Sequence, residues 1–171
     1  DIGGGTHNNF RFIPTGILGW KLPMTRTWKK DTALITPKLQ VIASPVNINP
    51  YEIPNDDSSN VELTASNLFS NERFPGLDRV EDGLRIDYGC ESTLKNTSGA
   101  RIHSTMGRAY RSHKQNLLGT VAGFPNEHSD IVGSITFAPS NDIDAYYDYR
   151  LTSKNLNSRR NRLNIELRDG P

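Results

Sequence analysis

The side chains that most often carry enzyme chemistry are few in this sequence and far apart. The four histidines, His7, His103, His113 and His128, fall in separate segments with neither an HxH nor an HxxxH spacing. Metal ligands usually recur at such spacings, so these histidines predict no metal centre. His103 and Ser104 are adjacent in a segment with strand character, where neighbouring side chains point to opposite faces. They therefore cannot form a nucleophile–base pair.

The glycine-rich start and the single cysteine add no further chemistry. "DIGGGTHNN" (1–9) has neither the preceding strand nor the lysine of a phosphate-binding loop, and the chain holds no GxSxG elbow. Cys90 is the only cysteine, so a disulfide within the chain is excluded. Its place on an apolar strand face indicates a small buried hydrophobe. The sequence thus predicts no cofactor, and only a serine and a histidine from different strands could still form a hydrolase site.

Composition excludes two further classes of protein. The 20 basic and 19 acidic residues leave a net charge of +1, which is too balanced for a nucleic-acid-binding surface. No window approaches the roughly 18 consecutive apolar residues of a transmembrane helix. A membrane β-barrel is not excluded, because only alternate residues of its strands face lipid. The chain starts at Asp1 without a visible signal peptide and stops after a strong strand, so we expect a piece of a longer polypeptide.

Alternation of apolar and polar residues is the dominant pattern along the chain. It predicts strands within 15–23, 33–44, 84–90, 99–111, 129–140, 142–152 and 159–169. Pro37 weakens the second of these predictions, because proline cannot donate to a sheet ladder. Short polar turns are expected near 94–98, 139–142 and 153–158.

The segment from about 45 to 80 is long, polar and punctuated by prolines, which predicts an extended loop. Within it, Ser59 and Glu62 form a capping-box pattern ahead of "LTASNLFS" (63–70), which predicts a helical turn or two there. Alternating short and long connections are typical of an outer-membrane barrel, with short turns on the periplasmic side.

Apolar and charged residues separate onto opposite faces of the predicted strands. The apolar face carries Leu84, Ile86, Tyr88, Ile135, Phe137, Tyr147, Tyr149, Leu163, Ile165 and Leu167. The charged face carries Arg85, Asp87, Asp144, Asp148, Arg150, Arg160, Arg162 and Glu166. In a transmembrane barrel the first set would face lipid and the second a wet lumen, whereas in a soluble sheet the second set would face water. An arginine at the bilayer midplane costs about 2–4 kcal/mol, so a barrel would fix this register.

One block of residues points to a known family. "NLFSNERFPGLDRVEDGLRIDYG" (67–89) contains Asn67, Leu68, Phe69, Arg73, Phe74, Gly76, Asp78, Arg79, Gly83 and Arg85. In these residues and their spacing it resembles the LptD family of LPS-assembly proteins, which are large outer-membrane barrels. "MGRAYR" (106–111) resembles the family's Gly-Gln-x-Tyr strand, with Arg108 where glutamine is usual. The flanking strands are also similar, so the resemblance covers nearly the whole chain.

The resemblance implies an antiparallel transmembrane β-barrel segment, with residues 1–171 forming part of one barrel domain. It implies transport without covalent chemistry, namely the insertion of lipopolysaccharide into the outer leaflet of the outer membrane. The implied partners are lipopolysaccharide, an LptE-like plug lipoprotein, the periplasmic LPS-bridge proteins and membrane lipid. In the loop, Phe69 and Phe74 are expected to pack together, and Asp78 and Arg79 to pair.

Two other hypotheses remain open at the level of the residues. One is a soluble, secreted β-sandwich or carbohydrate-binding module with its charged face in water. The other is an outer-membrane lipid hydrolase. A barrel segment should need detergent or lipid to fold, whereas a sandwich should fold cooperatively in plain buffer.

Overall fold

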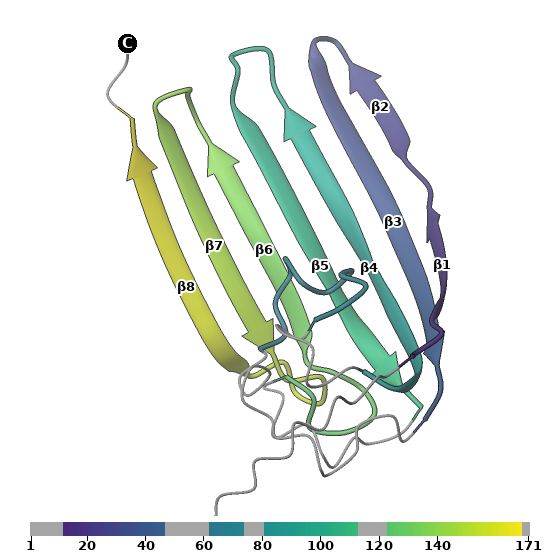
Figure 1. Ribbon diagram of the computed structural model, residues 1–171. Coiled ribbons are helices and arrows are strands. Elements are labelled where there is room, and N and C mark those ends of the chain that lie inside the picture. The colour runs from purple at the N-terminus through teal and green to yellow at the C-terminus, as the bar shows by residue number, and fades with distance from the viewer. Residues whose placement is uncertain (1–11, 47–61, 74–80, 113–122, 169–171) are drawn as a thin grey trace, which may run out of the picture.

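The computed structural model describes residues 12–46, 62–73, 81–112 and 123–168. Its strands are β1 Gly16–Lys21, β2 Met24–Trp28, β3 Asp31–Ser44, β4 Gly83–Lys95, β5 Arg101–Arg111, β6 Ile131–Ala138, β7 Ile143–Leu151 and β8 Ser158–Leu167. They form one antiparallel sheet in the order β1-β3-β4-β5-β6-β7-β8, with β2 also paired to β3 (Figure 1). Within these ranges the sheet does not close on itself, and no helix is long and apolar enough to cross a membrane. The predicted all-β antiparallel architecture is therefore confirmed.

Strands β1 and β2 are two parts of one edge strand. Lys21 pairs with Lys38 and Met24 with Ile35, so the register continues without a slip across the interruption at Leu22 and Pro23. Pro37 lies opposite this interruption, where two prolines without N–H groups weaken the ladder. Pro37 thus coincides with a break in the edge strand between β1 and β2. Strand β3 itself runs unbroken for 14 residues, because β4 pairs along its other side.

The connections differ in length at the two ends of the sheet (Figure 1). The short turns at 29–30, 96–100 and 139–142 lie at one end, which we call the short-turn end. The connections at 45–82, 112–130 and 152–157 lie at the other, the long-loop end. The predicted short turns at 94–98, 139–142 and 153–158 are all present. The last of them nevertheless lies at the opposite end from the other two, because connections alternate ends in a meander.

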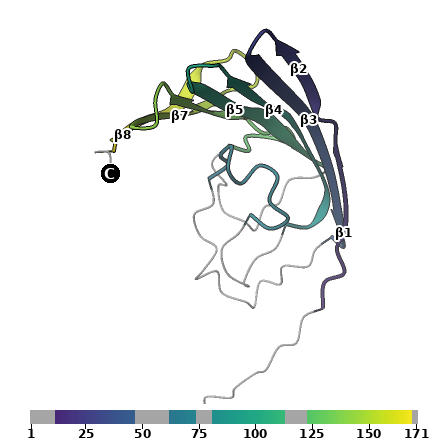
Figure 2. The ribbon, with the colours of Figure 1, turned by 90° about the horizontal axis from the view of Figure 1, so that it is seen from above.

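The sheet is curved, and residues 62–73 lie against its concave side (Figure 2). We call these residues the covering segment. Its apolar side chains pack on small side chains of the sheet and form the buried cluster Leu63, Leu68, Ala109 and Val132, with Phe69 and Phe124 at its margin. Gly107 leaves room for this contact, since a Cβ there would lie 2.5 Å from Leu68 Cδ2.

The helical turn predicted at 63–70 does not form. The Asn67 side chain accepts a hydrogen bond from the Thr64 N–H at 2.8 Å and donates one to the Glu62 carbonyl at 2.8 Å. These bonds close a non-helical turn and compete with helical ones, as asparagine side chains commonly do. Ser59, the other member of the expected capping box, lies outside the described residues.

Candidate functional site

The strand register separates the two sets of side chains as the sequence predicts. Direct cross-strand partners share a face, and one row runs Ile35, Ser92, Ser104, Ile135, Tyr147 and Leu163. All residues of the predicted apolar set lie on the convex face, and all residues of the charged set lie on the concave face. Several convex side chains are strongly exposed, including Leu163 at 63% and Leu167 at 73%. His103 and Ser104 point to opposite faces, where they bond to Thr93 and Ser92.

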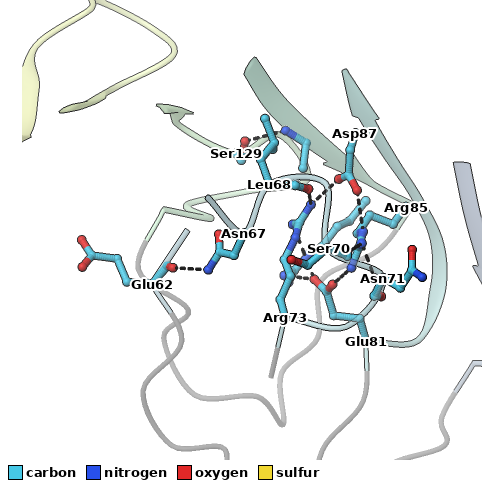
Figure 3. Close-up of polar contacts among 12 residues, drawn as sticks. Glu62, Asn67, Leu68, Ser70, Asn71, Arg73, Glu81, Arg85, Asp87 and Ser129 are labelled. Carbon is cyan, nitrogen blue, oxygen red and sulfur yellow. Dashed lines mark hydrogen bonds and ion pairs between the residues drawn. The ribbon is translucent and has the colours of Figure 1, made fainter. Parts of the chain in front are cut away.

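Five charged side chains meet between the covering segment and the sheet and form what we call the arginine cluster: Arg73, Glu81, Arg85, Asp87 and Arg111. Figure 3 shows the first four of them. Asp87 on β4 contacts Arg73 directly and accepts from Arg85 Nε at 3.0 Å. Glu81 pairs with Arg85 and Arg111. The Asp87 side chain is 0% exposed and that of Arg73 is 1% exposed. Because water does not reach them, each charge is compensated by its ionic partners.

The arginines also hold the backbone of the covering segment. Arg73 Nη2 donates to the Leu68 carbonyl at 2.7 Å, and Arg85 Nη2 donates to the Ser70 carbonyl. Burial lowers the pKa of the Arg73 guanidinium, while the charge and hydrogen bond of Asp87 oppose that shift. Charge-assisted hydrogen bonds of this kind are stronger than neutral ones. The cluster therefore fixes the path of residues 68–73 over β4.

Phe124 covers the same arginines from the β5–β6 connection. Its ring centroid lies 3.7 Å from Arg111 Cζ and 5.5 Å from Arg73 Cζ, which is cation–π geometry. The following residues extend the contact with β5, because Ser129 N donates to the Ala109 carbonyl at 2.8 Å and Ser129 Oγ accepts from the Ala109 N–H at 2.8 Å.

A second ionic group anchors the other end of the covering segment. Arg150 on β7 and Arg160 on β8 are direct cross-strand partners, a placement that is unfavourable for like charges. Glu62 bridges them, accepting from Arg150 Nη1 at 2.8 Å and pairing with Arg160. Asp130 and Asp148 lie nearby, at 3.6 Å from Arg150 Nε and 3.7 Å from Arg160 Nε. We call this set the Glu62 cluster.

The remaining predicted residues have mixed outcomes. Arg162 faces Asp148 in register, and Glu166 faces Asp144, whose carboxylate pairs with Arg168 at 2.6 Å. Phe69 packs beside the apolar cluster, with Lys38 Nζ 4.7 Å from its ring centroid. Phe74, Gly76, Asp78 and Arg79 lie outside the described residues, so the Phe69–Phe74 contact and the Asp78–Arg79 pair remain predictions. Gly83 has φ 75° at the start of β4, a backbone conformation that favours glycine.

Three residues of the two clusters were not singled out in the sequence. Arg111 is an alternate residue of β5 in the series Gly107, Ala109 and Arg111, so its side chain points to the same face as theirs. Alternation alone could therefore have placed it on the concave face. Glu81 precedes β4, where no periodicity applies. Asp130 lies within the predicted strand segment 129–140, where alternation places it on the same face as Val132. The predicted capping role of Glu62 is replaced by its pairing with two arginines. Among the described residues, no group of His, Cys, Asp or Glu is arranged to hold a metal ion.

A curved antiparallel β-wall, mostly apolar on its convex side and ionic on its covered concave side, is the class of structure that the fold and site define. By register, Arg26 and Arg108 also lie on the convex side. The chain belongs to the LptD family: the family model "LptD: LPS transport system D" matches residues 3–171.

Individual relatives agree with this assignment. The chain is 27% identical over 113 residues to an LPS-assembly protein LptD of Hahella chejuensis, covering 64% of this chain and 14% of that protein. The LptD of Nitrosomonas eutropha is 24% identical over 121 residues, covering 70% and 17%. The LptD of Acinetobacter baumannii is 30% identical over 110 residues, covering 64% and 13%. The matched part of the chain thus spans about a seventh of the length of these relatives.

Proposed function

We propose that this chain is a stretch of wall of an outer-membrane β-barrel that inserts lipopolysaccharide into the outer leaflet of the outer membrane. The observation that carries the proposal is the polarity of the sheet. Its apolar convex face is exposed, whereas its charged concave face is covered by the chain itself. A lipid-facing wall around a wet lumen needs this arrangement, with charges inward and hydrocarbon outward.

A soluble β-sandwich would need the opposite arrangement. Two packed sheets bury their apolar faces against each other and leave polar faces in water. In the described part of the chain, the layer that covers the sheet packs on the ionic face instead (Figure 2). Leu18, Ile165 and Leu167 remain 72%, 63% and 73% exposed on the other side. Hydrocarbon is the surrounding that satisfies such a surface without a second protein layer.

The proposed work of this segment is physical transport. LptD is described as a component of LPS transport, and no covalent step is needed to move a lipid along a polar passage. The whole of 1–171 would belong to the barrel domain, with the covering segment folded into the lumen at the long-loop end. Its polar surface would contact lipopolysaccharide sugars or an LptE-like plug lipoprotein, while periplasmic LPS-bridge proteins deliver the substrate. The surrounding membrane lipid would contact the convex face.

A matched pair of substitutions on β8 tests the placement in the complete parent protein. Ile165 lies on the convex face and Asn164 is its neighbour on the concave face, opposite Tyr146. We expect Ile165→Arg to reduce assembly in the outer membrane, because the arginine would face lipid at a cost of about 2–4 kcal/mol near the midplane. Asn164→Arg should assemble normally, because its side chain would face water.

The readout is the amount of heat-modifiable, folded protein in the outer-membrane fraction, together with lipopolysaccharide at the cell surface. Equal assembly of the two variants would overturn the proposed orientation of the sheet.

A further inference from the structure

Three hydrogen-bond donors lie together on the convex face, toward its long-loop end. Arg108 on β5 and Tyr88 on β4 are direct cross-strand partners, and Tyr110 follows Arg108 by two positions on the same face of β5. Tyr88 is 37% exposed, and Arg108 and Tyr110 are half-buried. We call these three residues the donor group.

The charge of Arg108 has no ionic partner. Among the residues that the structure describes, no carboxylate forms an ion pair with it. Its Nη2 donates to the Ser129 carbonyl at 3.0 Å, and Ser129 precedes β6 at the long-loop end. The guanidinium therefore extends toward that end of the sheet, as arginine side chains near a membrane surface do. A guanidinium has several N–H donors, so Arg108 can bind a further acceptor.

Polar side chains elsewhere on the convex face bind one another. The hydroxyls of Ser92 and Ser104 lie 2.7 Å apart, and the Tyr147 hydroxyl donates to Asn161 Oδ1 at 2.7 Å. The two tyrosine hydroxyls of the donor group, by contrast, have no hydrogen-bond partner in the described strands and connections. The donor group thus combines a positive charge with hydroxyls that lack an acceptor.

Aromatic side chains surround the donor group. Trp20 lies in the same cross-strand row as Tyr88, with Leu39 between them. The ring of Tyr110 lies beside that of His128, with centroids 5.0 Å apart. Tryptophan and tyrosine are enriched where a membrane protein meets the lipid headgroups. In the proposed barrel this level belongs to the outer leaflet, because short turns face the periplasm.

We propose that the donor group binds a phosphate group of one lipopolysaccharide molecule in the outer leaflet. The phosphate would accept hydrogen bonds from Arg108 and Tyr88, and the acyl chains would lie on the apolar convex face. Clustered donors around a guanidinium select an anion, and the surrounding apolar face selects a lipid over a free phosphate. The inference rests on the proposed function, which supplies lipopolysaccharide to this leaflet.

Photo-crosslinking in the complete parent protein tests the site. Leu39 is 39% exposed and is the cross-strand partner of Tyr88, so p-benzoylphenylalanine in its place would react with a lipid beside the donor group. The protein is placed in phosphatidylcholine nanodiscs that hold a small fraction of lipopolysaccharide, and adducts are detected with an antibody against the saccharide. We expect a strong adduct with lipopolysaccharide and a weak one with lipopolysaccharide whose phosphates have been removed.

A matched pair of arginine variants tests the charge. Arg108→Gln should lower the adduct yield roughly fivefold, because the cationic contact with the phosphate is lost, while glutamine can still donate to the Ser129 carbonyl. Arg26→Gln is the control, since it removes the same charge from the same face at the short-turn end, where Arg26 lies opposite Ala33. It should leave the yield unchanged. Equal yields from the two variants would overturn the site.

A second pair tests the hydroxyl without changing charge. Tyr88→Phe should lower the adduct yield roughly threefold, because one hydrogen bond to the phosphate is lost. Tyr147→Phe is the control, because its hydroxyl already donates to Asn161. Equal yields from these two variants would overturn the assignment of Tyr88 to the site.

Inorganic phosphate distinguishes a lipid from a free ion. Added to the buffer, it should not reduce the adduct. A reduction would assign the site to a free phosphate and overturn the lipid proposal.

The remaining outcomes separate this inference from the proposed function. Equal adducts with lipopolysaccharide and its phosphate-free form would overturn the lipid site alone if Ile165→Arg still fails to assemble. If Ile165→Arg assembles as well as Asn164→Arg, the membrane placement fails, and the lipid site fails with it.

Discussion

Asp87 is the residue on which the arginine cluster depends most. Its carboxylate is fully buried and contacts two guanidinium groups, Arg73 and Arg85. A buried ion network is weak evidence for a gain in stability, since removing charges from water is costly. Removing one partner is a different matter, because it leaves buried charge uncompensated.

We therefore expect Asp87→Asn to lower the free energy of unfolding of the folded parent protein by about 3–5 kcal/mol. Glu91→Gln is the control on the same face of the same strand. Glu91 pairs with Lys38 at 2.7 Å but is 34% exposed, so its loss should cost less than about 1 kcal/mol. Urea unfolding in detergent micelles, followed by tryptophan fluorescence, measures both values. Similar losses for the two variants would show that Asp87 is not buried as described.

At the scale of elements, the strands and their faces could be predicted from the sequence, because period-two alternation is a local property of each segment. Leu84 to Cys90 and Leu163 to Leu167 show this alternation most clearly. The alternation predicts which side chains of each strand share a face. The covering segment has no period, and its shape depends on Asn67 hydrogen bonds within the turn. The capping-box pattern predicted a helical turn there. The actual partners of Glu62 are Arg150 and Arg160, which lie 88 and 98 positions further along the chain, so a local pattern could not identify them.

The two ends of the covering segment are held by interactions of different exposure. Glu62 is 34% exposed, whereas the side chains of the arginine cluster are at most 9% exposed. Salt screens exposed pairs more than buried ones. The Glu62 end should therefore detach more readily than the Arg73 end.

Glu62→Gln should increase hydrogen exchange at residues 62–68 severalfold and leave residues 83–95 of β4 unchanged. The increase follows from the loss of the bridge between Arg150 and Arg160. Glu72→Gln is the matched control, because Glu72 is an exposed carboxylate in the same segment. High salt should mimic Glu62→Gln in the unmodified protein. If Glu72→Gln had the same effect, segment charge alone, and not the bridge, would control the exchange.

At the scale of the whole molecule, the described sheet has two edges. Strands β8 and β1/β2 each pair on one side only, so their other backbone N–H and C=O groups have no sheet partner within the described ranges. Unpaired edges promote association between chains. The aligned stretch covers only 13% to 17% of each relative. In the proposed barrel, neighbouring strands would complete these edges.

Residues 1–171 produced alone and refolded in detergent should therefore self-associate, whereas the complete protein should not do so through these strands. Light scattering of both preparations at equal concentration measures the difference. Adding proline within β8, as in Leu163→Pro, should reduce association through that edge. A monodisperse, monomeric segment would contradict the expectation that its edges need partners.

The covering segment connects strands that are not neighbours, since Asn71 bonds to Gln40 on β3 at 2.8 Å and Glu62 pairs with Arg160 on β8. Hydrogen bonds between adjacent strands leave a sheet free to bend about its strand axes. A segment bonded to both β3 and β8 fixes the distance between these two strands. It thereby fixes the local curvature of the sheet. This stretch would then keep its own shape when the curvature of the sheet changes elsewhere.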